Sequence, residues 1–222
     1  MPNTISQSTA ISWITAWRAN PDDKVKAFFI PVDDLTNLML DENCIGVRAY
    51  LAFGNEDGNP EAKLLLVDVE GDISTGGTDI LANGIYDFTK PCPSKCDTSS
   101  PLYTAQDDGS NPPTGDNRIS LTDAIDWIKV WRQNPDLGVK AFFIPKDDVT
   151  NLLKDGDCVG VRAYLAFGND GEDPAESKLL LVNVNEDSTG TDKDVIMNGI
   201  YDFTKPCPSK CDTSSPLYTL RP

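Results

Sequence analysis

The sequence predicts an α+β protein built from two tandem copies of one domain, each with two short helices packed on a small, mainly antiparallel sheet. Three observations lead to this prediction. The chain is internally duplicated, apolar residues near the start of each copy have helical spacing, and several short apolar segments are separated by polar turns. The predicted order in each copy is α-β-α-β-β-β, with the helices on one face of the sheet.

The duplication runs through almost the whole chain. The segments VKAFFIP, GVRAYLAFGN and KLLLV each occur twice, and the stretch NGIYDFTKPCPSKCDTSSPLYT spans residues 83–104 and again 198–219 without a change. Each unit has about 100 residues, which is a normal domain size. We therefore predict one domain at residues 1–104 and a second at 118–222. The segment 105–117 is polar and rich in Gly, Pro and Asp, which is typical of an exposed linker.

The first predicted element of each copy is an amphipathic helix. In the first copy, four apolar residues that recur in the second copy have the spacing i, i+3, i+4 and i+7: Ala10, Trp13, Ile14 and Trp17. The two tryptophans lie on the same stripe as the isoleucine, so we predict that they belong to the core and do not form a binding platform. The sequence Asn134-Pro135 marks the end of the second copy's helix.

Four strands and a second helix complete each copy. In the first copy we predict a short buried strand at residues 25–31 and a helix at 33–40, preceded by a proline and opened by two acids, which suit a helix N-terminus. Residues 47–54 and 63–69 are apolar segments joined by a polar turn, which predicts a hairpin. The last predicted strand is the segment GIYDF.

The six cysteines form two groups. Four of them make two Cys-x3-Cys pairs in proline-rich surroundings, and we predict a local disulfide in each pair that holds an irregular C-terminal segment: Cys92, Cys96, Cys207 and Cys211. The other two, Cys44 and Cys158, come just before predicted strands. We predict that they are buried free thiols, because an unpaired cysteine often behaves as a small apolar residue.

Other interpretations of the paired cysteines stay open. If the two pairs met in space, their four thiolates would form the ligand set of a structural zinc site or an iron–sulfur cluster. Alternatively, all the thiols are reduced, as is usual in the cytoplasm. A thioredoxin-like redox role fits less well, because such motifs have two residues between the cysteines and these pairs have three.

Composition argues against several functional classes. The chain has no histidine, so Ser-His and Cys-His nucleophiles and the commonest zinc ligand are excluded. No Walker A, G-x-S-x-G or G-x-G-x-x-G motif is present, and we predict no cofactor. The net charge of −16 would repel a phosphate backbone, so we predict no nucleic-acid partner. No apolar run is long enough for a spanning helix, so we predict no membrane insertion.

Acidic residues are the remaining candidates for catalysis or metal binding. Six aspartates occur at equivalent positions of both copies: Asp33, Asp34, Asp147, Asp148, Asp87 and Asp202. The first four lie at predicted helix starts, where the helix dipole stabilises them. The other two lie in predicted strands, where Asp87 alternates with Tyr86 and Phe88 and is expected to face solvent or a turn. The acidic turns at 55–61 and 169–176 offer oxygen ligands for Ca²⁺, but their register differs between the copies and the EF-hand pattern is missing. We assign no catalytic or metal residue.

The function predicted from these observations is a non-enzymatic binding or structural module of unknown ligand, which is either a protein or a small molecule. The two domains are expected to pack against each other. The alternatives are a thiol–disulfide redox protein, a protein bridged by a metal ion on four cysteine thiolates, and a carboxylate-dependent enzyme. Residues 1–12 lack the pattern of a secretion signal. Oxidised Cys-x3-Cys pairs would indicate an exported or cell-surface protein, and reduced pairs a cytoplasmic one.

Overall fold

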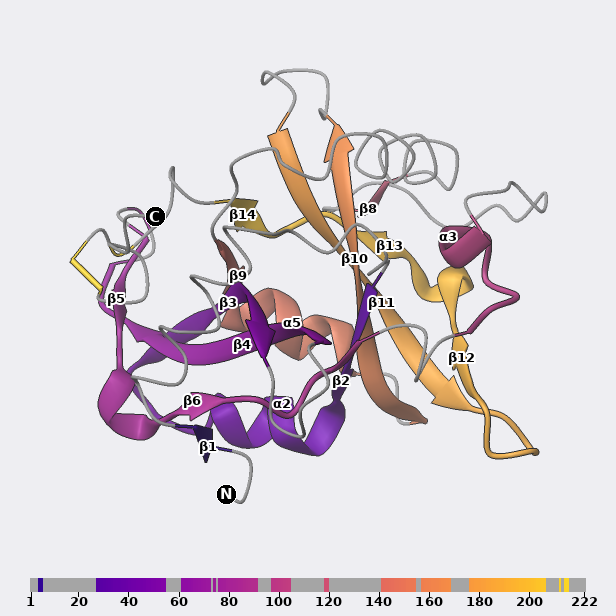
Figure 1. Cartoon of the computed structure of the whole chain (residues 1–222), viewed down its shortest axis with the longest axis horizontal. Coiled ribbons are helices and arrows are strands. Elements are labelled where there is room, and N and C mark those ends of the chain that lie inside the picture. The colour runs from indigo at the N-terminus through magenta and orange to yellow at the C-terminus, as the bar shows by residue number, and fades with distance from the viewer. Residues whose placement is uncertain are drawn as a thin grey trace.

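The computed structural model describes residues 4–5, 27–54, 61–72, 74, 76–91, 97–104, 118–119, 141–154, 157–168, 176–206, 212 and 214–215. In these residues the protein is mainly β, with two sheets of seven strands each (Figure 1). The α-helices described are three short segments: α2 (Val32–Leu38), α3 (Pro101–Thr104) and α5 (Lys146–Leu152). The prediction of α+β domains, each with two helices packed on a small sheet, is therefore wrong.

The strands account for this difference. The strands β3 (Cys44–Gly54) and β10 (Cys158–Gly168) have 11 residues each and pair along their length with β4 (Glu61–Glu70) and β11 (Glu176–Glu186). Both hairpins were expected, but several two-residue strands form from polar or proline-containing stretches that have no apolar alternation. The predicted helices through Trp13 and Trp17 and through their second-copy equivalents lie outside the described residues.

Each sheet follows the same plan, and the pairings described are all antiparallel. The first sheet has the order β1 (Thr4–Ile5), β6 (Ile85–Tyr86), β4, β3, β9 (Ala141–Pro145) and β14 (Lys205–Pro206), with β5 (Thr78–Asp79) beside β4. The second has the order β7 (Lys90–Pro91), β2 (Ala27–Pro31), β10, β11, β13 (Ile200–Tyr201) and β8 (Arg118–Ile119), with β12 (Asp192–Asp194) beside β11.

The two sequence repeats exchange strands. Strand β9 of the second repeat pairs with β3 of the first, and β2 of the first repeat pairs with β10 of the second. The short strands β14 and β7 are part of the same exchange. Strand β14 pairs with β9 and strand β7 pairs with β2, so each lies beside the exchanged strand of its own repeat in the opposite sheet. Each sheet therefore contains strands from both repeats, although the boundaries at 1–104 and 118–222 describe the sequence repeats.

A glycine opposite each exchanged strand allows close approach of the backbones. Gly46 lies opposite Pro145, and a Cβ atom at Gly46 would be 2.5 Å from the carbonyl oxygen of Ile144 and 2.6 Å from the ring of Phe143. Gly160 has the same environment against the first repeat's exchanged strand. The ring of the exchanged strand thus fills the space that a side chain would occupy.

Each exchanged strand leads directly into a seven-residue helix. Pro31 and Pro145 end β2 and β9 with extended backbone angles and stand at the N-cap positions of α2 and α5. In the first turns lie acids that suit the positive end of the helix dipole: Asp33, Asp34, Asp147 and Asp148. The helix predicted at 33–40 is confirmed in α2, which begins one residue earlier and ends two residues earlier.

The main hydrophobic core joins both repeats. It contains residues from the inner faces of the two long hairpins, together with leucine and valine side chains of α2 and α5 and the buried rings of Phe28 and Phe142 from the exchanged strands. A second cluster lies on the other face of the second sheet, where Leu102 of α3 packs beside Leu180 and Val182. Because α3 belongs to the first repeat, this cluster is also shared.

Candidate functional site

A buried arginine forms the centre of the first polar cluster. Arg48 on β3 is fully buried, and its guanidinium pairs with the carboxylate of Asp79 on β5 and donates to the carbonyl oxygen of Gly76. The hydroxyl of Tyr50, two residues further along β3, donates to Oδ2 of Asp79 at 2.6 Å. Alternation along the strand places both side chains on the same face, opposite the main core.

The second repeat contains the same cluster. Arg162 is fully buried and pairs with Asp194 on β12, and the hydroxyl of Tyr164 donates to Oδ2 of Asp194 at 2.5 Å. Burial, followed by the charge of Asp194, raises the pKa of Tyr164 well above its usual value. Burial also raises the pKa of Asp194, despite the opposing effect of the Arg162 charge. Both tyrosines are protonated hydrogen-bond donors at neutral pH, since burial raises the pKa of Tyr50 as well.

The duplicated cysteine-rich stretch closes each cluster from the opposite repeat. Oδ2 of Asp212 accepts a hydrogen bond from the backbone N–H of Asp79 at 3.1 Å, and Oδ2 of Asp97 accepts one from the backbone N–H of Asp194 at 3.2 Å. The other oxygen of each carboxylate accepts hydrogen bonds from the serine two residues later in its own segment. Lys193 adds an ion pair to Asp97 at 3.2 Å.

These hydrogen bonds determine the ionisation of the two bridging aspartates. Burial by itself raises the pKa of Asp97, but hydrogen bonds from Ser99, Lys193 and the backbone of Asp194 outweigh it and lower that pKa below its usual value. The pKa of Asp212 is lowered in the same way, with Ser214 as the main donor against the effect of burial. Both carboxylates are therefore ionised acceptors that join one repeat to the other.

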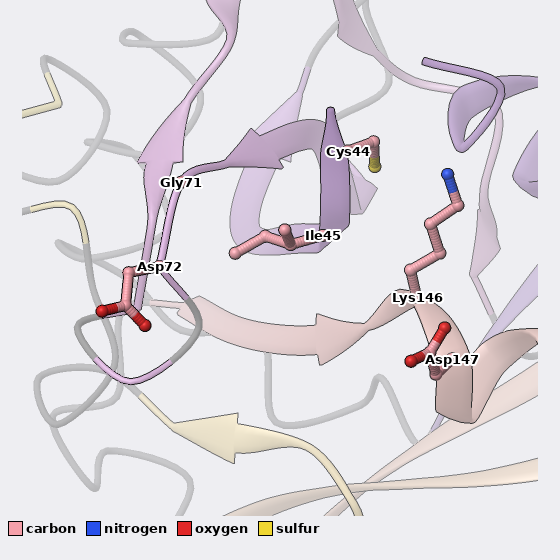
Figure 2. A pocket seen from close by; sticks show the side chains of 6 residues that line it. All are labelled: Cys44, Ile45, Gly71, Asp72, Lys146 and Asp147. Carbon is pink, nitrogen blue, oxygen red and sulfur yellow. The ribbon is translucent and has the colours of Figure 1, made fainter. Parts of the chain in front are cut away.

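A pocket of about 540 Å³ lies where α5 of the second repeat meets the first repeat's hairpin. Figure 2 shows the residues that line it: Cys44, Ile45, Gly71, Asp72, Lys146 and Asp147. They come from the start of β3, the turn after β4 and the first turn of α5. The Nζ atom of Lys146 donates to the carbonyl oxygen of Asp41 at 3.0 Å, so the lysine joins the two repeats.

The thiol of Cys44 points to the same side as the Lys146 ammonium group in Figure 2. Its Sγ donates to the carbonyl oxygen of Gly46 at 3.2 Å, and burial raises the pKa of the thiol. The thiolate is the nucleophilic form of cysteine, so Cys44 is a poor nucleophile at neutral pH. In the structure Cys44 is a buried free cysteine.

Next to the pocket, Asn83 bridges two carboxylates of the first repeat. Its Nδ2 donates to Oδ2 of Asp68 at 2.9 Å and to Oδ2 of Asp41 at 3.3 Å. Asp68 is only 3% exposed, and burial raises its pKa although the hydrogen bond from Asn83 and the charge of Lys146 oppose the shift. The ammonium group of Lys146 is thus part of the electrostatic environment of a buried acid.

The structure places the other predicted residues in separate parts of the fold. Cys158 is half-buried, and its Sγ donates to the carbonyl oxygen of Gly160 at 3.0 Å. Asp87 does not face solvent as expected: its carboxylate forms a buried ion pair with Lys63 at 3.2 Å. Asp202 is also buried. The paired cysteines Cys92, Cys96, Cys207 and Cys211 and most of the two acidic turns lie outside the described residues, so their predictions stay predictions. Within the described part of the chain, no group of three or more Cys, Asp or Glu side chains could hold a metal ion.

Sequence reasoning missed the two arginine clusters and Lys146. The signal for the clusters was present, since an arginine and a tyrosine two residues apart interrupt the same apolar strand in both copies.

Comparison with known proteins adds no assignment: no protein-family model, curated protein or solved structure matches this chain. Among the described helices, none is long and apolar enough to cross a membrane.

Proposed function

We propose that the protein is a non-enzymatic binding or structural module, in which the duplicated cysteine-rich stretch fastens each repeat onto the other. The observation that carries this proposal is the repetition of one buried Arg–Asp–Tyr cluster, closed each time by an aspartate of the opposite repeat. Perturbed ionisable groups are often a sign of an active site. Here the same groups serve structural hydrogen bonds: the buried arginine and tyrosine of each cluster bond to the aspartate of their own repeat, and an aspartate of the opposite repeat accepts from that residue's backbone N–H.

We assign ligand binding to the pocket lined by Lys146. The pocket volume of about 540 Å³ is within the usual range for small-molecule sites. Its wall carries one ammonium group and the carboxylates of Asp72 and Asp147, which suits a small polar molecule with both an acidic group and hydrogen-bond donors. The raised pKa of the Cys44 thiol argues against covalent chemistry there.

The experiment is a thermal-shift screen of small polar metabolites against the wild type and Lys146→Ala, each compared with its own melting temperature without ligand. Lys154→Ala is the matched control, because Lys154 is exposed and donates only to Asn151 within the described hydrogen bonds. We expect a ligand-induced shift that Lys146→Ala abolishes and Lys154→Ala keeps. Screens for hydrolase and redox turnover accompany it, and turnover that is lost on a single substitution in the pocket would show that the protein is an enzyme.

A further inference from the structure

The two repeats differ at a pair of positions that the strand exchange brings near each other. The sequence KLLLVDV of the first repeat is KLLLVNV in the second, so Asp68 corresponds to Asn183. The sequence FFIPVDD of the first repeat is FFIPKDD in the second, so Val32 corresponds to Lys146. One repeat therefore has the buried acid, and the other has the lysine.

In the first sheet, the strand exchange brings Lys146 into the surroundings of Asp68. The pairing of Gly46 with Pro145 positions the first residue of α5 at the start of β3, and α5 packs on that strand. From there Nζ of Lys146 donates to the carbonyl oxygen of Asp41. The carboxylates of Asp41 and Asp68 both accept hydrogen bonds from the Asn83 side chain. The Oδ1 atom of Asp68 is buried and has no hydrogen-bond partner among the described residues, and the positive charge of Lys146 opposes the rise in the Asp68 pKa that burial causes.

On the side of the second sheet, both members of the pair are neutral. The pairing of Gly160 with Pro31 positions Val32 at the equivalent point, where α2 packs on β10. The residue that corresponds to Asp68 is here Asn183, which is 1% exposed and whose Nδ2 donates to the carbonyl oxygen of Leu152 at 2.6 Å. Its Oδ1, like Oδ1 of Asp68, has no hydrogen-bond partner among the described residues, but the amide is neutral and needs no counter-ion, so valine is sufficient at this position.

We propose that this matched pair is a specificity determinant, by which the core of the first repeat accepts the strand–helix segment of the second repeat (residues 141–152) in preference to its own (residues 27–38). If each segment folded back on its own repeat, Val32 would lie near Asp68 and Lys146 near Asn183. A buried carboxylate would then have lost its cation, and the lysine would face a neutral amide. The same mismatch arises when two first repeats from different chains exchange with each other.

The test moves the lysine from one helix to the other without changing composition. In the full-length double variant Val32→Lys/Lys146→Val, the exchanged fold places valine near Asp68 and lysine near Asn183. We expect the unfolding equilibrium constant, measured by urea titration, to rise at least about tenfold, because a buried charge is left without its partner. A variant that is as stable as the wild type while its two halves stay in one particle after cleavage at a protease site within residues 105–117 would overturn the proposal, since the mismatched exchange would then carry no penalty. Halves that separate after cleavage would support it, since the lysine would have redirected each segment to its own repeat.

Two further variants separate the pair from general destabilisation. Lys146→Val alone is expected to raise the unfolding constant, and Asp68→Asn/Lys146→Val to restore it to near the wild-type value, because the first sheet then carries the neutral pair of the second. If Asp68→Asn leaves the effect of Lys146→Val unchanged, the two residues are not coupled and the proposal is wrong. If Lys146→Val does not fold, recovery of a folded monomer in the double variant supports the coupling, and failure to recover it contradicts the proposal.

Discussion

Cutting the linker tests the strand exchange directly. The perturbation is a protease recognition sequence inserted within residues 105–117, followed by complete cleavage of the purified protein. In two separate domains, the linker is the main connection between the halves. In the exchanged fold, β2 and β9 remain inserted in the sheets of the opposite repeat after the cut. We therefore expect both fragments to stay in one particle.

The expected strength of this association follows from the exchanged strands. Six large apolar side chains, three from each strand, are buried in the opposite sheet: Phe28, Phe29, Ile30, Phe142, Phe143 and Ile144. Each contributes about 1.5–3 kcal/mol on burial, so their total is about 9–18 kcal/mol before the entropy cost of association is subtracted. A micromolar dissociation constant corresponds to about 8 kcal/mol, so the halves should remain together at a concentration of about 10 µM.

The assay is size-exclusion chromatography with light scattering, together with native mass spectrometry, before and after cleavage. The expected result is one particle of unchanged mass that contains both fragments and separates only in denaturant. An insertion that is left uncut controls for effects of the added sequence. Two folded fragments that elute separately at this concentration would refute the reasoning, because they would show that each repeat completes its own sheet.

Four further predictions concern single features of the fold. Gly46→Ala should lower the free energy of unfolding by about 1–3 kcal/mol in a urea titration, because its Cβ would clash with the backbone of Ile144. Tyr50→Phe should lower it by about 1–3 kcal/mol, because Oδ2 of a buried aspartate loses its donor. Asp212 has a lowered folded-state pKa, so its stabilisation is present above the unfolded value of 3.8 and is lost as the pH falls through the folded value. Urea titrations at pH 5 and pH 3 should therefore show a larger loss for the wild type than for Asp212→Asn. Intact mass after denaturing alkylation should show four cysteines protected before reduction and six alkylated after it, whereas six alkylated from the start would contradict the predicted disulfides.

Local elements were predictable from the sequence because their causes are local. The buried strand before Pro31, the helix that follows it and the two long hairpins each have a pattern of apolar and turn residues within a few positions. The fold class was not predictable in this way. The edge strand Lys90–Pro91 has no apolar alternation, and it forms because β2 offers free backbone groups at the edge of the second sheet.

The candidate site likewise has one feature that the local sequence predicts and others that depend on distant residues. The thiol of Cys44 was predicted to be buried, because a cysteine before an apolar strand has a local explanation. The contacts of Lys146 depend on a residue 105 positions away, and nothing in its neighbourhood in the sequence indicates them. The role of Asp97 was missed for the same reason, since the residue that it bonds belongs to the other repeat.

Positions that are identical in the two repeats cannot determine which repeat a segment packs against. The strands β2 and β9 share the sequence AFFIP, and either would find the same ring-over-glycine contact at Gly46 or Gly160. Apart from the connecting segments, positions that differ between the repeats are what can favour one pairing over the other. Asp68 with Lys146 and Asn183 with Val32 are matched in charge across the exchange and mismatched within each repeat. In a duplicated chain, compensating differences between the copies are therefore the place to look for strand exchange, even when the copies are nearly identical elsewhere.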